Sequence, residues 1–289
     1  MSAGDWDGEV RVESLAKVNL GLEITSKRED GFHDLVSVMQ TVGLADTLIF
    51  EPADEIAVES GVPGLKPEND LMWRAARALR EATGSKEGMR IRAEKQIPSR
   101  AGLGGGSSNC AVVLRTLNEL WDTGLPIERL AEIAAALGSD PAFFLWGGTA
   151  LTTGRGELVE PLPDAPDRWI VLAKPTESLS TPGVYAELRA AEHTDGQATR
   201  ALAAGLREGR LDYGLMRNNL APAELRLCPA MEPVLATLHE RADFAMVSGS
   251  GSSCFGLYAD AGTAKEAVGE MGGQGVWAAL GKLIGAARG

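Results

Sequence analysis

The chain has 289 residues, of which 44% are hydrophobic and 24% charged, a composition typical of a globular protein with a substantial core. Its 40 acidic and 28 basic side chains leave a net charge of −12, which repels nucleic acid phosphates and anionic lipid. We therefore expect no nucleic-acid partner.

The cysteines and the apolar runs indicate where the protein works. Cys110, Cys228 and Cys254 lie far apart and form no CxxC pair, which argues against a disulfide framework and favours the reducing cytoplasm. The longest apolar run, PAFFLWGGTAL, is shorter than the roughly 20 residues that a membrane span needs. Neither export nor membrane insertion is expected.

The first regular element is a strand. Even positions from Val10 to Ile24 are apolar except at Ser14, and this period of two predicts a long half-buried strand. The same period places Lys17 and Asn19 side by side on the opposite face. We therefore expect one face of this strand to be apolar and buried, and the opposite face to carry the polar pair.

The rest of the first half alternates between strands and helices. After the turn signal KREDGFHD come an apolar segment over 35–48 and short strand-like pieces over 48–50 and 56–58. A helix is predicted from Asn69 or Asp70 to Gly84, because the segment offers a cap, helical periodicity and a terminating glycine. A strand is expected over 89–97.

A proline cluster marks the expected domain boundary. The segment 126–137 is predicted to form a helix that ends at Gly138. PLPDAPD, over 161–167, is the richest proline cluster in the chain, so we expect domains over 1–163 and 164–289. The second domain begins with the strand-like run WIVLA.

The stretch IPSRAGLGGGSSNC is the strongest chemical signal. Four of the five residues in Gly102–Gly106 are glycine, so the backbone can approach a ligand closely. Ser107, Ser108 and Asn109 are good helix caps, and apolar residues follow at helical spacing. The free amides at such a helix start favour a phosphate, although the glycines could simply form a tight strand-to-helix turn.

Two familiar nucleotide motifs do not account for this loop. A Walker A loop needs a lysine and Ser or Thr directly after the last glycine, and this loop has neither arrangement. The spacing also fails to give GxGxxG with an acidic residue about twenty positions on, as a dinucleotide site requires. Another nucleotide-binding architecture is needed.

The glycine-rich loop and three further segments resemble the GHMP small-molecule kinases. The segments are LAKVNLGLEITSKREDGFHDLVSVMQTVGLAD, LGSDPAFFLWGGTALTTGRGE and SGSGSSCFGLY, in the same order and spacing. The resemblance implies an α+β fold of two domains, a ribosomal-protein-like α/β domain and a ferredoxin-like domain, with the active site in the cleft between them. AKVNL, REDGFHDL and GRGE most resemble a branch that phosphorylates a cytidyl diphosphate sugar alcohol in the non-mevalonate isoprenoid pathway.

The resemblance implies two catalytic residues. Asp140 would be the base that accepts the proton of the substrate hydroxyl, and Lys17 would position that hydroxyl and assist the carboxylate. Without the resemblance, Asp140 before Pro141 is a good helix cap, and Lys17 is an ordinary strand lysine. The family more often has Val then Pro where this chain has Pro141 then Ala142.

The resemblance also implies an ATP site with Mg²⁺. Because the chain shows no DFG-like aspartate and no Walker B signature, the metal would be held mainly by ATP and by the hydroxyl of Ser107. Asn69 and Lys95 would lie near the adenine, although they are also an ordinary helix cap and strand lysine. Arg100 replaces a small residue of the family, and we favour a solvent-facing side chain over one that flanks the phosphates. The implied ATP-binding residues are Asn69, Lys95, Pro98, Ser99, Arg100, Ala101, Gly102, Leu103, Gly104, Gly105, Gly106, Ser107, Ser108 and Asn109.

The implied substrate site lies in three further segments. Asn19 would touch the alcohol, and Phe32 and His33 stand where the family usually has Tyr-His, a pair that stacks on and hydrogen-bonds to cytosine. The alternative for this pair is a core phenylalanine beside an exposed turn histidine. Thr181 and Pro182 would contact the nucleotide head of the substrate.

A second glycine loop, SGSGSSC over 248–254, would close over the first through Gly249 and Gly251. Its alternative is a hairpin turn between Met246 and Phe255.

The expected function is phosphoryl transfer from ATP to a small alcohol by a cytoplasmic monomer or weak homodimer. The alternatives are another GHMP kinase, of the homoserine or mevalonate type, and a non-catalytic nucleotide sensor on the same fold. The first would leave the aromatic-histidine pair unexplained, and the presence of both Lys17 and Asp140 speaks against the second.

Overall fold

The structure is a computed structural model, and it describes residues 8–286. Within these residues the chain forms two compact units, and each unit is discontinuous in sequence. Unit 1 comprises the chain up to Ala16, Ala45–Ile97 and Gly105–Trp146, and unit 2 comprises Lys17–Leu44, Pro98–Gly104 and the chain from Gly147 onward. The domain boundary expected after residue 163 stays a prediction.

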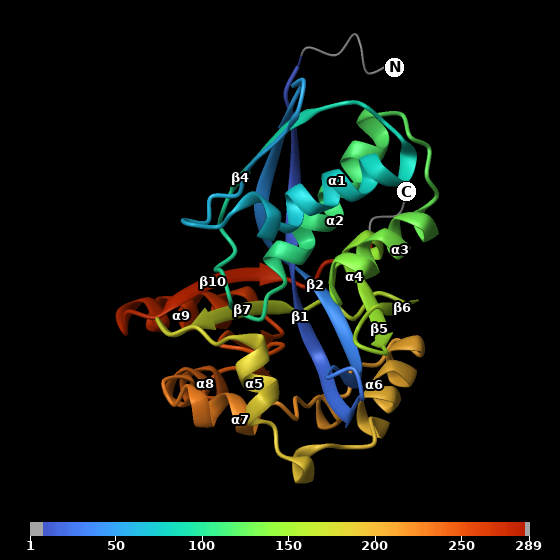
Figure 1. Ribbon diagram of the computed structural model, residues 1–289. Coiled ribbons are helices and arrows are strands. Elements are labelled where there is room, and N and C mark those ends of the chain that lie inside the picture. The colour runs from blue at the N-terminus through green and yellow to red at the C-terminus, as the bar shows by residue number, and fades with distance from the viewer. Residues whose placement is uncertain (1–7, 287–289) are drawn as a thin grey trace. The chain divides into compact units, whose positions relative to one another are not determined.

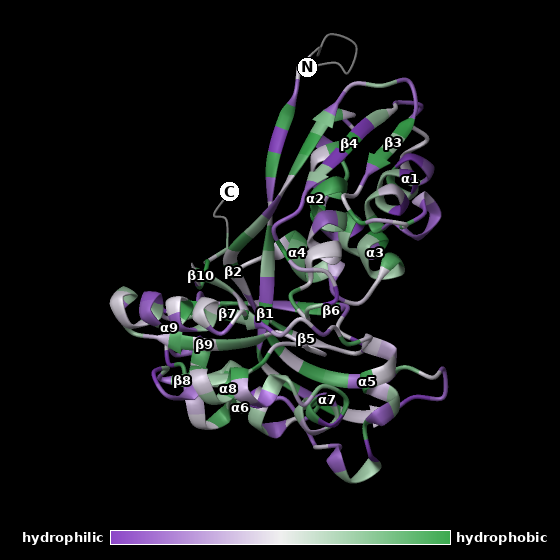
Figure 2. Cartoon of the chain, turned by 90° about the vertical axis from the view of Figure 1, so that its left-hand side faces the viewer, coloured by the Kyte–Doolittle hydropathy of each residue, from purple (hydrophilic) through white to green (hydrophobic). Residues whose placement is uncertain are grey.

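Most of the elements are labelled in Figure 1, and β3, β8 and β9 are labelled in Figure 2. The strands are β1 Val10–Lys27, β2 His33–Glu51, β3 Ile56–Glu59, β4 Met89–Glu94, β5 Thr149–Thr153, β6 Leu158–Leu162, β7 Trp169–Lys174, β8 Phe244–Val247, β9 Cys254–Tyr258 and β10 Trp277–Lys282. The α-helices are α1 Leu71–Thr83, α2 Gly105–Leu120, α3 Ile127–Leu137, α4 Pro141–Trp146, α5 Thr181–Glu187, α6 Gln197–Arg207, α7 Ala221–Leu227, α8 Met231–His239 and α9 Ala261–Gly273.

In unit 1, four helices gather beside strands that belong to a six-stranded sheet. α1 and α2 pack together, and α2, α3 and α4 contact one another (Figure 1). The second half of β2 pairs with β4 in antiparallel register, with Thr47 opposite Glu94, and β4 pairs with β3. Hydrophobic and polar residues alternate along β4 (Figure 2). The hydrophobic side chains, at the odd-numbered positions, all point to the buried face of the strand.

The start and end of α1 follow from local chemistry. The Asp70 carboxylate accepts a hydrogen bond from the Met72 N–H at 2.8 Å, and Gly84 adopts the left-handed conformation that ends the helix. The predicted helix is confirmed, and its cap is Asp70. Asn69 lies in the short 3₁₀ turn Pro67–Asn69, so its interpretation as the cap of this helix is wrong.

In unit 2, a four-stranded antiparallel sheet has the order β10-β7-β9-β8. By position in the chain this is the order 4-1-3-2, with helices between the first and second and between the third and fourth strands. That arrangement is the ferredoxin-like motif that was expected. Its core includes Val171, Leu220, Val234, Val247 and Met271, all buried.

Several predicted elements differ in extent from those observed. The strand expected over 89–97 is shorter, because β4 ends at Glu94. The apolar segment and the short piece over 48–50 form a single strand, β2, which pairs with β5 in unit 2 and with β4 in unit 1. The helix after the glycine-rich loop starts at Gly105, so Ser107, Ser108 and Asn109 lie inside the helix rather than at its cap. The three consecutive polar residues predicted a cap at their own position. The helix instead begins two residues earlier, with two glycines.

None of the helices over 8–286 is both long and apolar enough to cross a bilayer. The three cysteines are all buried, as reduced thiols. Burial raises the pKa of Cys110 to about 12 and raises that of Cys228 and Cys254 as well.

Candidate active site

In unit 2, the two glycine loops lie against each other. The Ser253 N–H donates to the Ala101 carbonyl at 3.1 Å, and the Ser248 hydroxyl donates to the Gly102 carbonyl at 3.1 Å. A Cβ on Gly102 would lie 2.1 Å from the Ser248 carbonyl oxygen, and Gly102 has a φ of +73°. Only glycine fits at this contact.

The second loop is also a hairpin turn. β8 and β9 pair with Met246 opposite Phe255, and residues 248–253 connect them. The two interpretations of SGSGSSC therefore hold together, because the turn of this hairpin is the part that meets the first loop.

Lys17 and Asn19 stand beside these loops. A Cβ on Gly249 would lie 2.9 Å from the Gly102 carbonyl, 3.1 Å from Lys17 Nζ and 3.2 Å from Asn19 Oδ1. The backbone N–H of Lys17 donates to the Leu103 carbonyl at 3.0 Å. β1 is thus joined directly to the first loop, at the point where its polar pair projects.

The polar pair belongs to a buried hydrogen-bond chain. Lys17 Nζ donates to Asn19 Oδ1 at 2.7 Å, Asn19 Nδ2 donates to the Ser37 hydroxyl at 2.7 Å, and that hydroxyl donates to the Gly21 carbonyl at 2.7 Å. Both Lys17 and Asn19 are almost fully buried, so the face of β1 that carries them is covered as well as the apolar face. A buried ammonium held in this way is a preorganised positive charge.

In unit 1, the start of α2 carries some polar groups that solvent can reach and others that are buried and hydrogen-bonded within the protein. Ser107 is half-buried and Gly106 exposed, whereas Ser108 and Asn109 are buried. The Ser14 hydroxyl donates to the Ser108 hydroxyl at 2.7 Å, so Ser108 is occupied within the core. Ser107 is the better candidate to meet a ligand, and the helix start favours an anion there.

Among the other predicted ATP residues, Lys95 and Arg100 differ sharply. Lys95 Nζ forms an ion pair with the fully buried carboxylate of Asp46, and it would lie 3.4 Å from a Cβ on Gly105. Arg100 is exposed and has a φ of +52°. The preference for a solvent-facing side chain over one that flanks the phosphates stays a prediction. Asn69 is also exposed.

Asp140 immediately precedes α4 and is half-buried. Its carbonyl accepts a hydrogen bond from the Phe143 N–H at 3.1 Å, and Pro141 takes the first helical position. Asp140 therefore occupies the helix-start position that its sequence predicts, in unit 1, where the helix dipole stabilises a negative charge.

Phe32 and His33 open onto a cluster of rings in unit 2. The ring centroids of His33 and Tyr185 lie 5.0 Å apart, and those of His33 and His193 lie 6.1 Å apart. The Arg155 guanidinium lies 4.7 Å from the centroid of the Phe32 ring, which is 51% exposed. An exposed aromatic face next to polar rings suits a flat heterocycle.

Burial lowers the pKa of His33 from its ordinary value, and His193 and Lys27 lower it further. The imidazole is therefore neutral near pH 7 and offers one hydrogen-bond donor and one acceptor. Phe32 is exposed and its ring carries Arg155, so the alternative of a core phenylalanine is wrong.

Thr181 lies next to the second loop. Its hydroxyl and that of Ser250 are 2.8 Å apart, at the start of α5. Ser180 caps this helix by accepting from the Gly183 N–H at 3.2 Å, and Pro182 follows Thr181 in the first turn, where both are exposed. The start of α5 thus contributes to the same face of unit 2 as Gly249.

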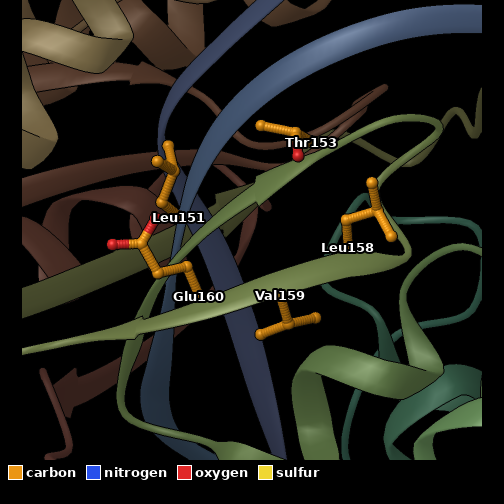
Figure 3. A pocket seen from close by; sticks show the side chains of 5 residues that line it. All are labelled: Leu151, Thr153, Leu158, Val159 and Glu160. Carbon is orange, nitrogen blue, oxygen red and sulfur yellow. The ribbon is translucent and has the colours of Figure 1, made fainter.

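A pocket elsewhere in unit 2 is not part of this site. It has a volume of about 220 Å³ and is lined by the β5 and β6 residues Leu151, Thr153, Leu158, Val159 and Glu160 (Figure 3). Its lining is mostly apolar, and the Glu160 carboxylate pairs with Arg207. It contains none of the predicted site residues.

Three residues beside the predicted site were missed from sequence. Asp46 contacts Lys95, Tyr185 contacts His33, and Arg155 covers Phe32. A charged residue inside the apolar run GLADTLIF was a usable signal for Asp46. Arg155 lies in the GRGE motif that carried the resemblance, which was a usable signal, whereas its contact with Phe32 and the position of Tyr185 arise only on folding.

Within residues 8–286, no three His, Cys, Asp or Glu side chains cluster as a metal-binding set. The Ser107 hydroxyl is the one predicted metal contact, and it is accessible at the start of α2. These groups fit a cation that brings most of its ligands with a bound polyphosphate.

The comparisons with known proteins agree over most of the chain. The family models "GHMP kinases N terminal domain" and "GHMP kinases C terminal" match residues 70–148 and 197–276. The chain is 42% identical over 257 residues to a 4-diphosphocytidyl-2-C-methyl-D-erythritol kinase of Listeria monocytogenes, covering 86% of this chain and 87% of that protein. It is 40% identical over 258 residues to the kinase of the same name from Geobacillus kaustophilus, covering 85% and 87%.

Solved structures give the same result. A crystal structure of 4-(cytidine 5'-diphospho)-2C-methyl-D-erythritol kinase matches with a TM-score of 0.82 and 34% identity, covering 96% of this chain and 100% of that chain. Homoserine kinase from Cytophaga hutchinsonii matches with a TM-score of 0.76 at 18% identity, covering 98% and 96%, a likeness of fold alone.

Proposed function

This protein belongs to the 4-diphosphocytidyl-2-C-methyl-D-erythritol kinases of the GHMP family, and we propose that its two glycine loops, Lys17 and Asp140 carry out that reaction. It is an ATP-dependent small-molecule kinase of the non-mevalonate pathway. The proposed step moves the γ-phosphoryl group of ATP to the C2 hydroxyl of the substrate. The observation that carries the assignment of residues is the position of Lys17 and Asn19 against both loops.

The glycine-rich loop would hold the phosphates. Residues Pro98–Gly104 have little side-chain bulk at Gly102 and Gly104, and the amides at the start of α2 attract negative charge. Lys95 and Asn69 are proposed to lie near the adenine. The Ser107 hydroxyl would hold Mg²⁺ that arrives with ATP, and the bound ion would neutralise charge on the phosphates.

Asp140 is proposed to accept the proton of the attacking hydroxyl. A carboxylate is one of the side chains that serve as the general base in such a transfer. Lys17, fixed by Asn19, would supply positive charge to the transferring group, and Asn19 would orient the alcohol. Positioning and charge neutralisation would therefore carry most of the catalysis.

The ring cluster would select the cytidyl group. Phe32 offers an exposed face for stacking, the neutral His33 offers one donor and one acceptor, and Tyr185 offers a second aromatic ring beside them. Thr181, Pro182 and Gly251 are proposed to contact the remaining nucleotide head. A homoserine or mevalonate kinase would have no use for such a cluster.

The first experiment compares acceptors. ADP release with Mg-ATP should be stimulated by the cytidyl-erythritol compound and remain at the level without acceptor for homoserine and mevalonate. Stimulation by homoserine or mevalonate alone would contradict the assignment of substrate. ATP binding without stimulation by any acceptor would favour a nucleotide sensor.

The second experiment tests the base. D140N should lower kcat by about 10²- to 10⁴-fold, the usual contribution of a general base, with the Kd for ATP within twofold of wild type. D167N, a change of an exposed aspartate, is the matched control and should leave kcat unchanged. Retained turnover in D140N would remove Asp140 from the mechanism, and loss of folding would favour a purely capping role.

The cytoplasmic location and the monomeric or weakly dimeric state remain predictions. Size-exclusion chromatography with light scattering at several concentrations would test the second of these.

A further inference from the structure

Asp46 is a carboxylate that the proposed reaction does not use directly. It lies on β2 in unit 1 and is fully buried. The pairing of β2 with β4 sets Thr47 opposite Glu94, so one step further along the same register Asp46 faces Lys95. A buried carboxylate is costly unless several donors surround it, which makes its partners informative.

Asp46 holds the chain where it enters the glycine-rich loop. Its Oδ1 accepts hydrogen bonds from the backbone N–H groups of Gln96 at 2.8 Å and Ile97 at 2.9 Å, directly before Pro98. Its Oδ2 pairs with Lys95 Nζ. Three consecutive residues at the entrance are thus bound to one carboxylate.

Asp46 also holds the chain where it leaves the loop. With its amide nitrogen turned toward Asp46, Asn109 has three acceptors within hydrogen-bond distance of that nitrogen: Asp46 Oδ2 at 3.2 Å, the Gly105 carbonyl at 3.1 Å and the Ser14 hydroxyl at 2.7 Å. The Ser14 hydroxyl in turn donates to Ser108. A Cβ on Gly105 would lie 3.0 Å from Ile97 Cγ2, so the two ends of the loop are in contact.

We infer that Asp46 is a positioning residue for ATP: it fixes both ends of the glycine-rich loop, and the ammonium of Lys95 between them, in the arrangement that accepts the nucleotide. This inference rests on the proposed binding of ATP phosphates by that loop. An amide at position 46 could still accept from one N–H group, but it would lose the ion pair and would set an NH₂ group against the donors.

The test compares D46N with E23Q. Glu23 is a matched control in unit 2, because it is also a buried carboxylate that accepts a backbone N–H, that of Thr199 at 2.7 Å. For both variants we would measure the Kd of a non-hydrolysable ATP analogue with Mg²⁺, the KM for ATP, the KM for the cytidyl acceptor, and the Tm. D46N should raise the first two by about tenfold or more, as expected for loss of hydrogen bonds to a charged group, and change the acceptor KM by less than about twofold.

Two outcomes would overturn the inference. One is an analogue Kd for D46N within about twofold of wild type, and the other is a rise in both KM values in the same proportion as in E23Q. If D46N does not fold, S14A decides, because it removes the partner of Asn109 and Ser108 and keeps Asp46 in place. S14A should raise the analogue Kd severalfold, and an unchanged Kd would reject the inference.

The analogue needs no acceptor, so its binding separates this inference from the proposed reaction. Weaker analogue binding in D46N, in a protein that phosphorylates no cytidyl compound, would leave the inference standing and reject the reaction. Full turnover of the cytidyl compound by wild type, together with unchanged analogue binding in D46N, would support the proposed reaction and reject the inference.

Discussion

Two buried carboxyl groups, in different units, have opposite surroundings. Asp46, beneath the entrance of the glycine-rich loop, is surrounded by two backbone N–H groups, the Lys95 ammonium and the Asn109 amide. Glu224, in α7, is equally buried, yet neither of its oxygens has a hydrogen bond of good geometry within residues 8–286. Equal burial therefore leaves one carboxyl solvated by the protein and the other not.

The two groups differ in the donors around them and not in their depth. Burial raises the pKa of Glu224 well above its ordinary value, and the nearby Asn218 and Lys17 lower it only in part. The Asn218 amide is occupied elsewhere, because it donates to the Gly249 carbonyl at 2.8 Å and to the Val247 carbonyl at 3.3 Å. Burial thus makes the ionised form of Glu224 costly, because few donors face its carboxyl group.

Removal of Asp46 should give the largest change in stability. D46A leaves the Lys95 charge and two backbone donors without their acceptor, and we expect a loss of about 3–5 kcal/mol in the free energy of unfolding. Urea unfolding measures it. The control is D260A, which removes an exposed cap that accepts the Thr263 N–H and should cost only about 1 kcal/mol. Equal losses in the two variants would mean that burial adds nothing to the role of Asp46.

Replacement of Glu224 by an apolar side chain should act in the opposite direction. E224M keeps the length of the side chain and removes the unpartnered polar atoms, so it should raise the free energy of unfolding by about 1–3 kcal/mol. Urea unfolding at pH 7 is again the measurement, with E224Q as the polar control. A lower free energy of unfolding for E224M than for wild type would show that the Glu224 carboxyl group makes a stabilising interaction.

The pH dependence of stability should also distinguish Glu224. Its pKa is raised on folding, so its contribution is fully present below the unfolded pKa and is lost as pH rises toward the folded value. Between pH 5 and pH 8 wild type should lose stability relative to E224Q, by at most about 1.4 kcal/mol per pH unit. A difference between the two proteins that stays constant with pH would contradict the raised pKa of Glu224.

The smallest effect should come from Arg155, whose guanidinium contacts the Phe32 ring but lies near solvent. R155A removes the guanidinium over the Phe32 ring and should raise the KM for the cytidyl acceptor about two- to fivefold, the range of an exposed cation–π contact. The KM for ATP should not change. In a Phe32→Ala background the same change should have no further effect, and an undiminished effect would mean that Arg155 acts without Phe32.

The sequence revealed the parts of the fold whose causes are local. Alternation predicted β1, and the cap and the terminating glycine predicted α1. It did not reveal that β2 runs unbroken over 19 residues, because its two halves pair with different strands. Register between distant segments has no local signature.

The candidate site divides in the same way. Gly102 could be predicted because a close backbone approach tolerates no side chain, and the contact with Ser248 explains why. Asp46, Arg155 and Tyr185 depend on residues that lie far away in the chain, and only the folded chain brings them together. The tertiary partners of a side chain are the part that the sequence does not state.

The buried cysteines make the protein convenient for site-directed spectroscopy. Only the thiolate reacts quickly with a maleimide, and all three thiols are buried with pKa values raised above the ordinary one. The folded wild-type chain should therefore take up almost no label. A cysteine introduced at an exposed position such as Leu158, which is 60% exposed, would then be the one labelled site, and no native cysteine would have to be removed.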